Sequence, residues 1–312
     1  MKIVFLDAKT IGDDIDLSGF DSLGEVTKYN FTTPEEAPER VKDADVLIIN
    51  KVPINENTVG TAKNLKLVCV TATGTNNLDK DYLDSHKIAW RNVAGYSTET
   101  VTQHTFAMLF YLLEKLRYYD DYVKDGNYIN DTSFTHFAEH FSEINGKTWG
   151  IIGLGAIGQL VANAATHLGM EVYGYDPYIS VDAAWNLSRD IHHIQNVEDI
   201  YRTCDYITIH VPLMDSTKGM INKAAIDEMK DGVVLLNYAR DLLVDEEALV
   251  EALDSGKVKK YVTDFANATV AGRPGILVTP HLGASTEESE ENCAVMAVKE
   301  VRDFLENGNI KN

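Results

Sequence analysis

Two residues of this 312-residue chain have side chains suited to acid–base and carboxylate chemistry. Arg240 follows the apolar run 232–237, and His281 follows the apolar run 276–280. An arginine presents a planar fork that can hold a carboxylate and a neighbouring carbonyl. A histidine titrates near neutrality, so it can give and take a proton reversibly. Either residue alone could equally be a surface ion-pair residue, and the elements that position them decide between the two interpretations.

A glycine-rich turn is the first such element. Residues 148–158 fit a buried strand, a turn and a helix start, with Gly153, Gly155 and Gly158 at the spacing of a dinucleotide-binding turn. The helix N-terminus there suits a pyrophosphate. Asp176 ends the next strand, where a carboxylate can bond ribose hydroxyls and repel a 2′-phosphate. The pattern predicts NAD rather than NADP. In a reaction with a nicotinamide cofactor, Arg240 could orient a 2-oxo acid and His281 could protonate its carbonyl oxygen.

The rest of the chain alternates short apolar runs with helical stretches, which predicts two doubly wound parallel sheets in an α/β fold. Ligands of such sheets lie beyond the carboxyl ends of the strands. In the first half, the loops 50–53 and 73–77 occupy that edge. Gly74 there could let main-chain N–H groups reach a carboxylate, and Lys51 is either a substrate contact or a solvated loop lysine. The expected strands are 3–6, 26–29, 44–50, 65–71, 89–92, 206–212, 232–237, 260–264 and 276–280, with helices at 34–43, 97–116 and 287–307.

Composition limits the possible partners. The net charge of −20 argues against nucleic acid or an anionic membrane surface as a partner. Three cysteines without paired spacing suggest free thiols in a reducing compartment. Because no signal peptide or membrane-spanning apolar run is evident, we expect a cytoplasmic protein.

The segment 118–142 is aromatic and polar, and could form a partner-helix surface or a packed arm. His136 and His140 are four residues apart there, but no carboxylate–histidine zinc motif accompanies them, so we expect no metal. His104 lies on a mostly apolar helix, and we interpret it as a core residue.

Four segments resemble the D-isomer-specific 2-hydroxyacid dehydrogenase family. They are Gly-Leu-Gly-Ala-Ile-Gly (153–158), His-Val-Pro-Leu with Thr-Lys-Gly-Met-Ile (210–221), Asn-Tyr-Ala-Arg-Asp-Leu-Leu-Val-Asp-Glu-Glu-Ala-Leu (237–249) and Thr-Pro-His-Leu-Gly-Ala-Ser-Thr (279–286). The resemblance implies a Rossmann NAD domain, residues 99–285, inserted in a flavodoxin-like substrate domain, residues 1–98 and 286–312. It also implies a homodimer, with the C-terminal helix completing the first domain.

The resemblance further implies roles for individual residues. Arg240 would orient the substrate, and His281 would be the acid/base. Asp176 would bind the ribose and Asp264 the nicotinamide amide, while His210, Val211 and Pro212 would flank the adenine. Substrate contacts would come from Lys51, Val52, Thr73, Gly74 and Arg240. Cofactor contacts would come from Gly153, Gly155, Ala156, Ile157, Gly158, Asp176, His210, Val211, Pro212, Thr217, Tyr238, Ala239, Asp264 and Gly283.

This chain departs from the family pattern in two places. The family glutamate that pairs with the histidine has its place at Ala268 or Thr269, and no acid lies between Asp264 and His281. Without a carboxylate partner, a histidine is less often protonated near pH 7, so we expect an acid-shifted pH profile. Replacement carboxylates would be Glu287, Glu288 or Asp241. Asp241 is itself the second departure, since it stands where the family usually has glycine.

Three functions fit these features. We favour an NAD-dependent D-2-hydroxyacid dehydrogenase acting on a small 2-oxo acid of the hydroxypyruvate, glyoxylate or pyruvate type. The first alternative is a phosphoglycerate dehydrogenase, although Lys51–Val52 stands where those enzymes offer arginine for the phosphate. The second alternative is an NAD-sensing binding protein with weak or no catalysis, which the absent glutamate favours and the retention of Arg240 and His281 disfavours.

Overall fold

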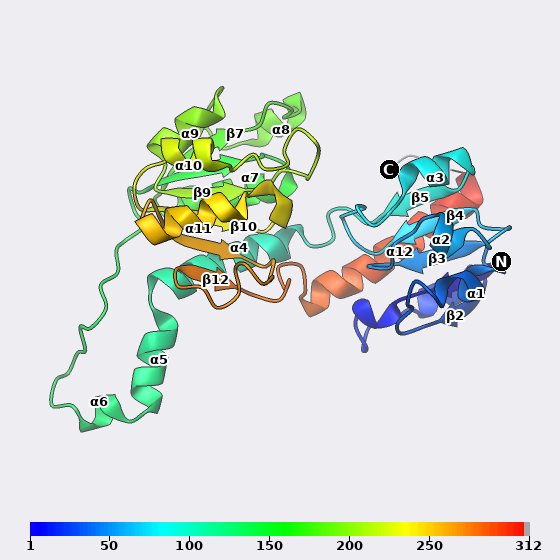
Figure 1. The fold of residues 1–312 in the computed structure, drawn as a ribbon, viewed down its shortest axis with the longest axis horizontal. Coiled ribbons are helices and arrows are strands. Elements are labelled where there is room, and N and C mark those ends of the chain that lie inside the picture. Colours follow the sequence, from blue (N-terminus) through cyan, green and yellow to red (C-terminus); the bar gives the residue numbers. More distant parts are fainter. Residues whose placement is uncertain (309–312) are drawn as a thin grey trace. The chain divides into compact units, whose positions relative to one another are not determined.

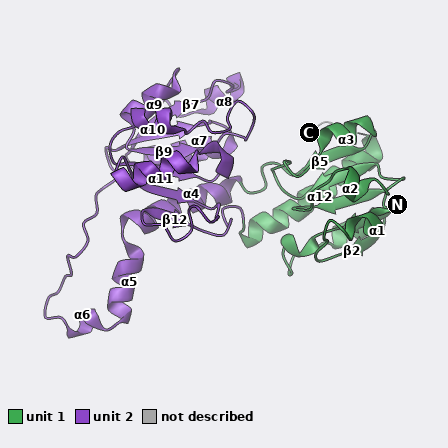
Figure 2. Cartoon of the chain, in the orientation of Figure 1, with its two compact units in different colours: residues 1–97, 285–312 green, residues 98–284 purple. Residues whose placement is uncertain are grey.

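The computed structural model describes residues 1–308, which form two compact α/β units. Unit 1 consists of residues 1–97 and the segment from Ser285 onward, and unit 2 is the intervening segment Thr98–Ala284 (Figure 2). Each unit is built on one parallel sheet, of five strands in unit 1 and seven in unit 2. The predicted fold class, with one α/β unit inserted in another, is therefore confirmed.

The sheet of unit 1 has the strand order β2-β1-β3-β4-β5, the order of flavodoxin-like folds. Its central strands β3 and β4 are continuous apolar runs because both faces of the sheet are covered. The elements of unit 1 are β1 (Lys2–Phe5), η1 (Ala8–Thr10), η2 (Ser18–Ser22), β2 (Glu25–Lys28), α1 (Ala37–Val41), β3 (Val46–Ile49), α2 (Glu56–Val59), β4 (Leu67–Val70), α3 (Lys80–Ser85), β5 (Ala89–Asn92) and α12 (Glu287–Asn307).

The long C-terminal helix α12 packs on β4 and β5 of unit 1. Its apolar face, which includes Cys293, Ala297 and Val301, lies in the same core cluster as Phe5 and Phe20. The prediction that the last helix returns to the first α/β unit is confirmed. Arg91 on β5 also forms ion pairs with this helix, with Glu300 at 3.3 Å and Asp303 at 3.1 Å.

The sheet of unit 2 has the order β12-β11-β10-β9-β6-β7-β8, which is the dinucleotide-binding order with one further strand. The sequence did not reveal β8, a three-residue strand whose two histidines are exposed. The elements of unit 2 are α4 (Thr98–Leu113), α5 (Leu116–Lys124), α6 (Asn127–Asn130), β6 (Thr148–Ile152), α7 (Ala156–His167), β7 (Glu171–Tyr175), α8 (Val181–Asn186), β8 (Ile191–His193), α9 (Val197–Thr203), β9 (Tyr206–Ile209), α10 (Lys223–Glu228), β10 (Val233–Asn237), η3 (Asp241–Leu243), α11 (Glu246–Ser255), β11 (Val258–Thr263) and β12 (Ile276–Val278).

The segment 115–142 forms an arm that extends away from the sheet of unit 2 (Figure 1). It begins at Lys115, whose left-handed φ of 54° turns the chain between α4 and α5. Within the arm, the His136 ring stacks on Tyr122 at a centroid distance of 3.7 Å. Several of its large apolar side chains are exposed, including Ile129, Phe134 and Phe137. Nowhere in residues 1–308 is a helix both long and apolar enough to cross a membrane.

Candidate active site

The glycine turn of unit 2 connects β6 to α7. Gly153 has a left-handed φ of 97°, and a Cβ there would lie 2.7 Å from the His210 carbonyl oxygen. A Cβ on Gly158 would lie 2.0 Å from the Gly153 carbonyl oxygen, so only glycine lets α7 approach the turn this closely. Gly155, the N-cap of α7, would meet nothing within 4 Å. The structure therefore has no room for a side chain at Gly153 or Gly158, whereas the space beside Gly155 is empty. Gly155, Ala156 and Ile157 begin the helix at this empty space.

Asp176 follows β7, and its carboxylate is held beside the glycine turn. Oδ2 accepts a hydrogen bond from the N–H of Leu154 at 2.9 Å, and Oδ1 accepts one from the N–H of Tyr178 at 2.8 Å. These two main-chain donors fix the acid at the carboxyl end of its strand, which is where ribose hydroxyls would meet it.

The loop after β9 forms the neighbouring wall. The Nε2 of His210 lies 3.0 Å from the Thr208 hydroxyl, and burial lowers the pKa of His210 to about 4, so its ring is neutral at pH 7. The Thr217 hydroxyl donates to the carbonyl of Pro212 at 2.6 Å and closes the loop. Val211 Cγ1 lies 2.9 Å from where a Cβ on Gly153 would stand, so this loop abuts the glycine turn.

Arg240 follows β10 in extended backbone conformation. The side chain of Asn237 braces this segment, since its Oδ1 accepts from the N–H of Ala239 and its Nδ2 donates to the Arg240 carbonyl at 2.8 Å. The Arg240 guanidinium is partly buried and donates through Nη1 to the Ala239 carbonyl. Asp241 turns away into η3 and accepts the N–H of Leu242, so its carboxylate is engaged locally.

Asp264 follows β11 and lies against His281, which follows β12. The Asp264 residue is 2% exposed, and its Oδ2 lies 3.2 Å from His281 Nδ1 and accepts the N–H of Gly283, also at 3.2 Å. A Cβ on Gly283 would lie 2.9 Å from that oxygen, so glycine permits the close approach. Sequence reasoning considered three other acids as partners of His281 and missed Asp264. Residue spacing could not reveal the contact between Asp264 and His281, because it depends on the backbone conformation of His281.

His104 is a second residue that the sequence interpretation passed over. It lies on α4 with its ring 5.2 Å from that of Tyr238, and its Nε2 is 3.4 Å from the Thr279 hydroxyl. Burial lowers the pKa of His104, while the nearby Asp264 carboxylate opposes this shift. Tyr238 is buried, and its hydroxyl has no hydrogen-bond partner among residues 1–308. His104 is thus both a packing residue and a neighbour of Asp264.

In unit 1 the buried Asp7 organises the loop that carries Lys51 and Val52. Its Oδ1 accepts the N–H of Asn50 at 2.9 Å, and its Oδ2 accepts those of Lys51 at 2.6 Å and Val52 at 3.1 Å. Asn77 braces the same loop by donating to the carbonyls of Asn50 and Val52. The sequence signal was available, because Asp7 follows a buried strand directly at the ligand-binding edge.

The next loop of unit 1 differs in its hydrogen bonding. Thr73 donates through its hydroxyl to the Val93 carbonyl at 3.3 Å. The N–H groups of Gly74, Thr75 and Asn76 donate to no acceptor in the part of the chain that the structure describes. Three consecutive amides at the end of β4 therefore remain for an anion, whereas those of Lys51 and Val52 are committed to Asp7.

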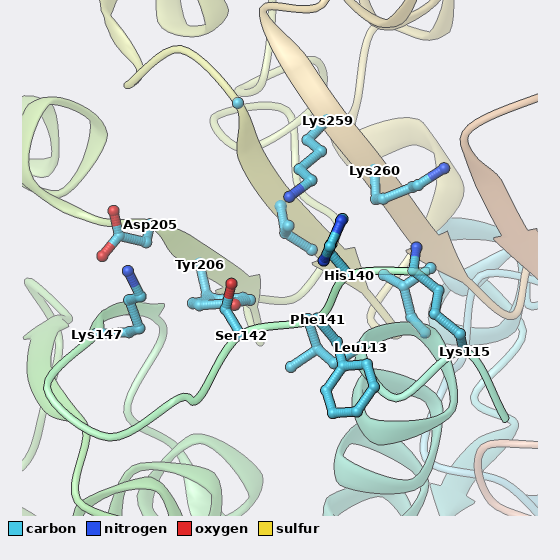
Figure 3. A pocket seen from close by; sticks show the side chains of 13 residues that line it. Leu113, Lys115, His140, Phe141, Ser142, Lys147, Asp205, Tyr206, Lys259 and Lys260 are labelled. Carbon is cyan, nitrogen blue, oxygen red and sulfur yellow. The ribbon is translucent and has the colours of Figure 1, made fainter. Parts of the chain in front are cut away.

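One cavity of unit 2 lies at the edge of its sheet opposite Arg240, Asp264 and His281. It has a volume of about 190 Å³ and opens at the amino ends of β9, β10 and β11, with Lys115, Lys147, Lys259 and Lys260 in its lining (Figure 3). Because Arg240 and Asp264 follow the carboxyl ends of β10 and β11, this cavity is separate from the chemistry. Among residues 1–308, no three His, Cys, Asp or Glu side chains gather as a metal site.

The strand order, the glycine turn and the polar residues at the carboxyl edge define unit 2 as the NAD-binding half of a two-domain oxidoreductase. The family model for the "D-isomer specific 2-hydroxyacid dehydrogenase, NAD binding domain" matches residues 106–283. The chain belongs to the D-isomer specific 2-hydroxyacid dehydrogenase family and is an NAD-dependent oxidoreductase of 2-hydroxy acids.

Relatives match over nearly the whole chain. It is 32% identical to hydroxypyruvate reductase of Blautia hydrogenotrophica, over 98% of this chain and 97% of that one. It is 33% identical to glycerate dehydrogenase of Methylorubrum extorquens, over 97% and 96% of the two chains. Its structure is similar to that of Aquifex aeolicus D-lactate dehydrogenase complexed with NAD and lactic acid. The TM-score is 0.83 and the identity 26%, over 98% and 95% of the chains.

The residues present fit NAD. The turn is open at Gly155, where a pyrophosphate would approach, and the fixed Asp176 carboxylate lies beside it. Asp264 Oδ1 is buried without a hydrogen-bond partner among residues 1–308, as is the Tyr238 hydroxyl. A buried polar atom without a partner is costly, and an amide from the nicotinamide would satisfy the Asp264 oxygen.

Proposed function

We propose that this enzyme reduces a small, unphosphorylated 2-oxo acid, of the hydroxypyruvate, glyoxylate or pyruvate type, to the D-2-hydroxy acid. The observation that carries this proposal is the order of side chains along one sheet edge. Arg240 follows β10, Asp264 follows β11 and His281 follows β12, and these three strands are neighbours. Neighbouring strands lie about 5 Å apart, so side chains at the ends of these three strands can contact the same small substrate.

The chemistry divides among these residues. NADH, when bound, supplies the hydride that the carbonyl carbon of the oxo acid accepts. Arg240 orients the substrate through its guanidinium and polarises the carbonyl. His281 gives a proton to the carbonyl oxygen during reduction and takes it back during oxidation of the hydroxy acid.

In unit 1 we assign the substrate carboxylate to the N–H groups of residues 74–76, with Lys51 adding charge. Thr73 and Val52 would shape these two loops. Neither loop contains an arginine, and a phosphate would be better held by a bidentate guanidinium. We therefore favour an unphosphorylated substrate over a phosphorylated one.

We further propose a homodimer that assembles through the arm. Ile129 is 81% exposed, Phe134 92% and Phe137 82%. Such a concentration of exposed apolar side chains on one segment suits a protein interface.

The three cysteines are free and buried, which supports the reducing environment of the cytoplasm as the location.

A panel of 2-oxo acids tests the proposed activity through oxidation of NADH. It includes glyoxylate, hydroxypyruvate, pyruvate, branched-chain oxo acids and phosphohydroxypyruvate. Arg240→Ala should lower kcat/KM at least a hundredfold, since it removes a charge-assisted bidentate contact worth about 3 kcal/mol. Lys51→Ala should cost far less. Equal losses in the two variants would refute the role of Arg240, and preference for phosphohydroxypyruvate would refute the substrate class.

A further inference from the structure

The acid/base histidine has an acidic partner in this chain although the family glutamate is missing. Asp264 Oδ2 lies 3.2 Å from His281 Nδ1, within the range of a charge-assisted contact. The carboxylate side chain is 3% exposed and the histidine side chain 49% exposed, so the pair has a buried end and an open end. Nε2 is therefore the ring nitrogen on the side away from the carboxylate.

The backbone fixes this arrangement. His281 has a left-handed φ of 53°, a conformation that costs a non-glycine residue about 1 kcal/mol or more. Its N–H donates to the Asp264 carbonyl at 2.8 Å and to the Thr279 carbonyl at 2.9 Å. The Phe265 ring packs against the imidazole, with the ring centroids 4.9 Å apart. Asp264 thus holds His281 through both main chain and side chain.

Asp241, another candidate for this role, makes a local contact. The Asp241 carboxylate accepts the N–H of Leu242. At the place of the family glutamate, the N–H of Thr269 is held by the Asn267 side chain, whose amide in turn donates to Glu246. Within residues 1–308, the ion pairs of His281 comprise this one contact with Asp264.

We propose that Asp264 is the positioning carboxylate of His281, so that one acid performs two tasks that the family pattern divides between two residues. Oδ2 holds Nδ1–H and leaves Nε2 to exchange the proton with the substrate oxygen. Oδ1, buried and without a partner among the described residues, remains for the cofactor amide. This inference rests on the proposed function of His281 as the acid/base.

Two further titratable side chains lie near Asp264. They are His104 on α4 and Tyr238 at the end of β10. Burial lowers the pKa of His104 and raises that of Tyr238 well above its usual value, so both are neutral at pH 7. The pH profile of kcat/KM measures whether the acid shift expected without the family glutamate occurs.

The first test uses Asp264→Ala, which removes the oxygen that contacts both His281 Nδ1 and the N–H of Gly283. Nitrogen-15 NMR of the histidine ring in the cofactor-free protein reads the tautomer without needing activity. We expect His281 to carry its proton on Nδ1 in the wild type, and the variant to lose that preference. A wild-type ring protonated on Nε2, or the same tautomer in both proteins, would overturn the proposal.

The second test is the pH profile of kcat/KM for reduction. Asp264→Asn should lose at least a hundredfold at pH 8 but about tenfold or less at pH 5.5, with the melting temperature and NADH affinity measured in parallel. Asp241→Asn is the matched control, and its profile should keep the wild-type shape. A shift in the control but not in Asp264→Asn, or an equal loss at all pH values, would refute the positioning role. If the wild type reduces no oxo acid while the tautomer is as expected, the proposed function fails and the pairing stands.

Discussion

The variant Gly155→Ala separates cofactor binding from folding. A Cβ at Gly155 meets no atom within 4 Å, and its φ of −68° is open to any residue. Alanine restricts the unfolded chain but is a poorer N-cap than glycine. These effects oppose each other, so the free energy of unfolding should change by less than about 1 kcal/mol.

The same methyl group should strongly weaken cofactor binding. The main-chain N–H groups at the start of α7 can bond a pyrophosphate only if nothing stands between them. Loss of two such bonds, at about 1.5 kcal/mol each, raises the NADH dissociation constant about a hundredfold. Fluorescence titration with NADH and thermal melting measure the two effects separately.

Gly158→Ala is the contrasting control, because its Cβ would lie 2.0 Å from the Gly153 carbonyl oxygen. A main-chain atom must move there, so this variant should lose stability as well as affinity. The reasoning is refuted if Gly155→Ala binds NADH within threefold of the wild type at an unchanged melting temperature. The dinucleotide would then not cross the turn at this glycine.

Three further predictions concern Asp7, His210 and Arg91. Asp7→Asn can keep its oxygen for Lys51 and Val52 but then turns an amide donor toward the N–H of Asn50. Urea unfolding should show a loss of about 2 kcal/mol, and KM for the oxo acid should rise. An unchanged KM would separate this loop from the substrate. Burial lowers the pKa of His210 from 6.5 to about 4, so the unfolded state binds the extra proton as the pH falls from about 6.5 to 4, and stability falls with it. Between pH 7 and 4.5 the wild type should lose about 2 kcal/mol more than His210→Asn, and parallel curves would contradict this. Arg91→Met removes the arginine that pairs with both Glu300 and Asp303 of α12. The free energy of unfolding in urea should fall by about 2 kcal/mol. No loss would mean that α12 is held by its apolar face alone.

Much of the fold follows from local patterns. Apolar runs bounded by breakers predicted the central strands, and β5 was predicted with its observed bounds, Ala89–Asn92. The strand β8 was missed because three residues with two exposed histidines give no periodicity. The turn at Lys115 has no glycine, so its left-handed backbone could not be read from residue type.

The candidate site shows a sharper division. Arg240, His281 and the glycine turn were predicted because each follows an apolar run at the ligand-binding edge. The contact between Asp264 and His281 was not, since it needs a left-handed histidine that packing imposes. Asp7 could have been found by the same edge argument that identified Lys51. His104 was interpreted as a core residue, and its position beside Tyr238 and Asp264 is visible in the structure alone.

Transfer of deuterium from NADH that carries deuterium at both hydrogen positions of nicotinamide C4 tests the central claim most directly. The enzyme is incubated with the labelled cofactor and the best oxo acid of the panel, and the product is analysed by mass spectrometry and chiral chromatography. We predict one deuterium at C2 of a D-2-hydroxy acid, formed at least a hundredfold more slowly by Arg240→Ala. Tight binding of NADH without deuterium in any product would contradict the account and leave a protein that only senses the cofactor.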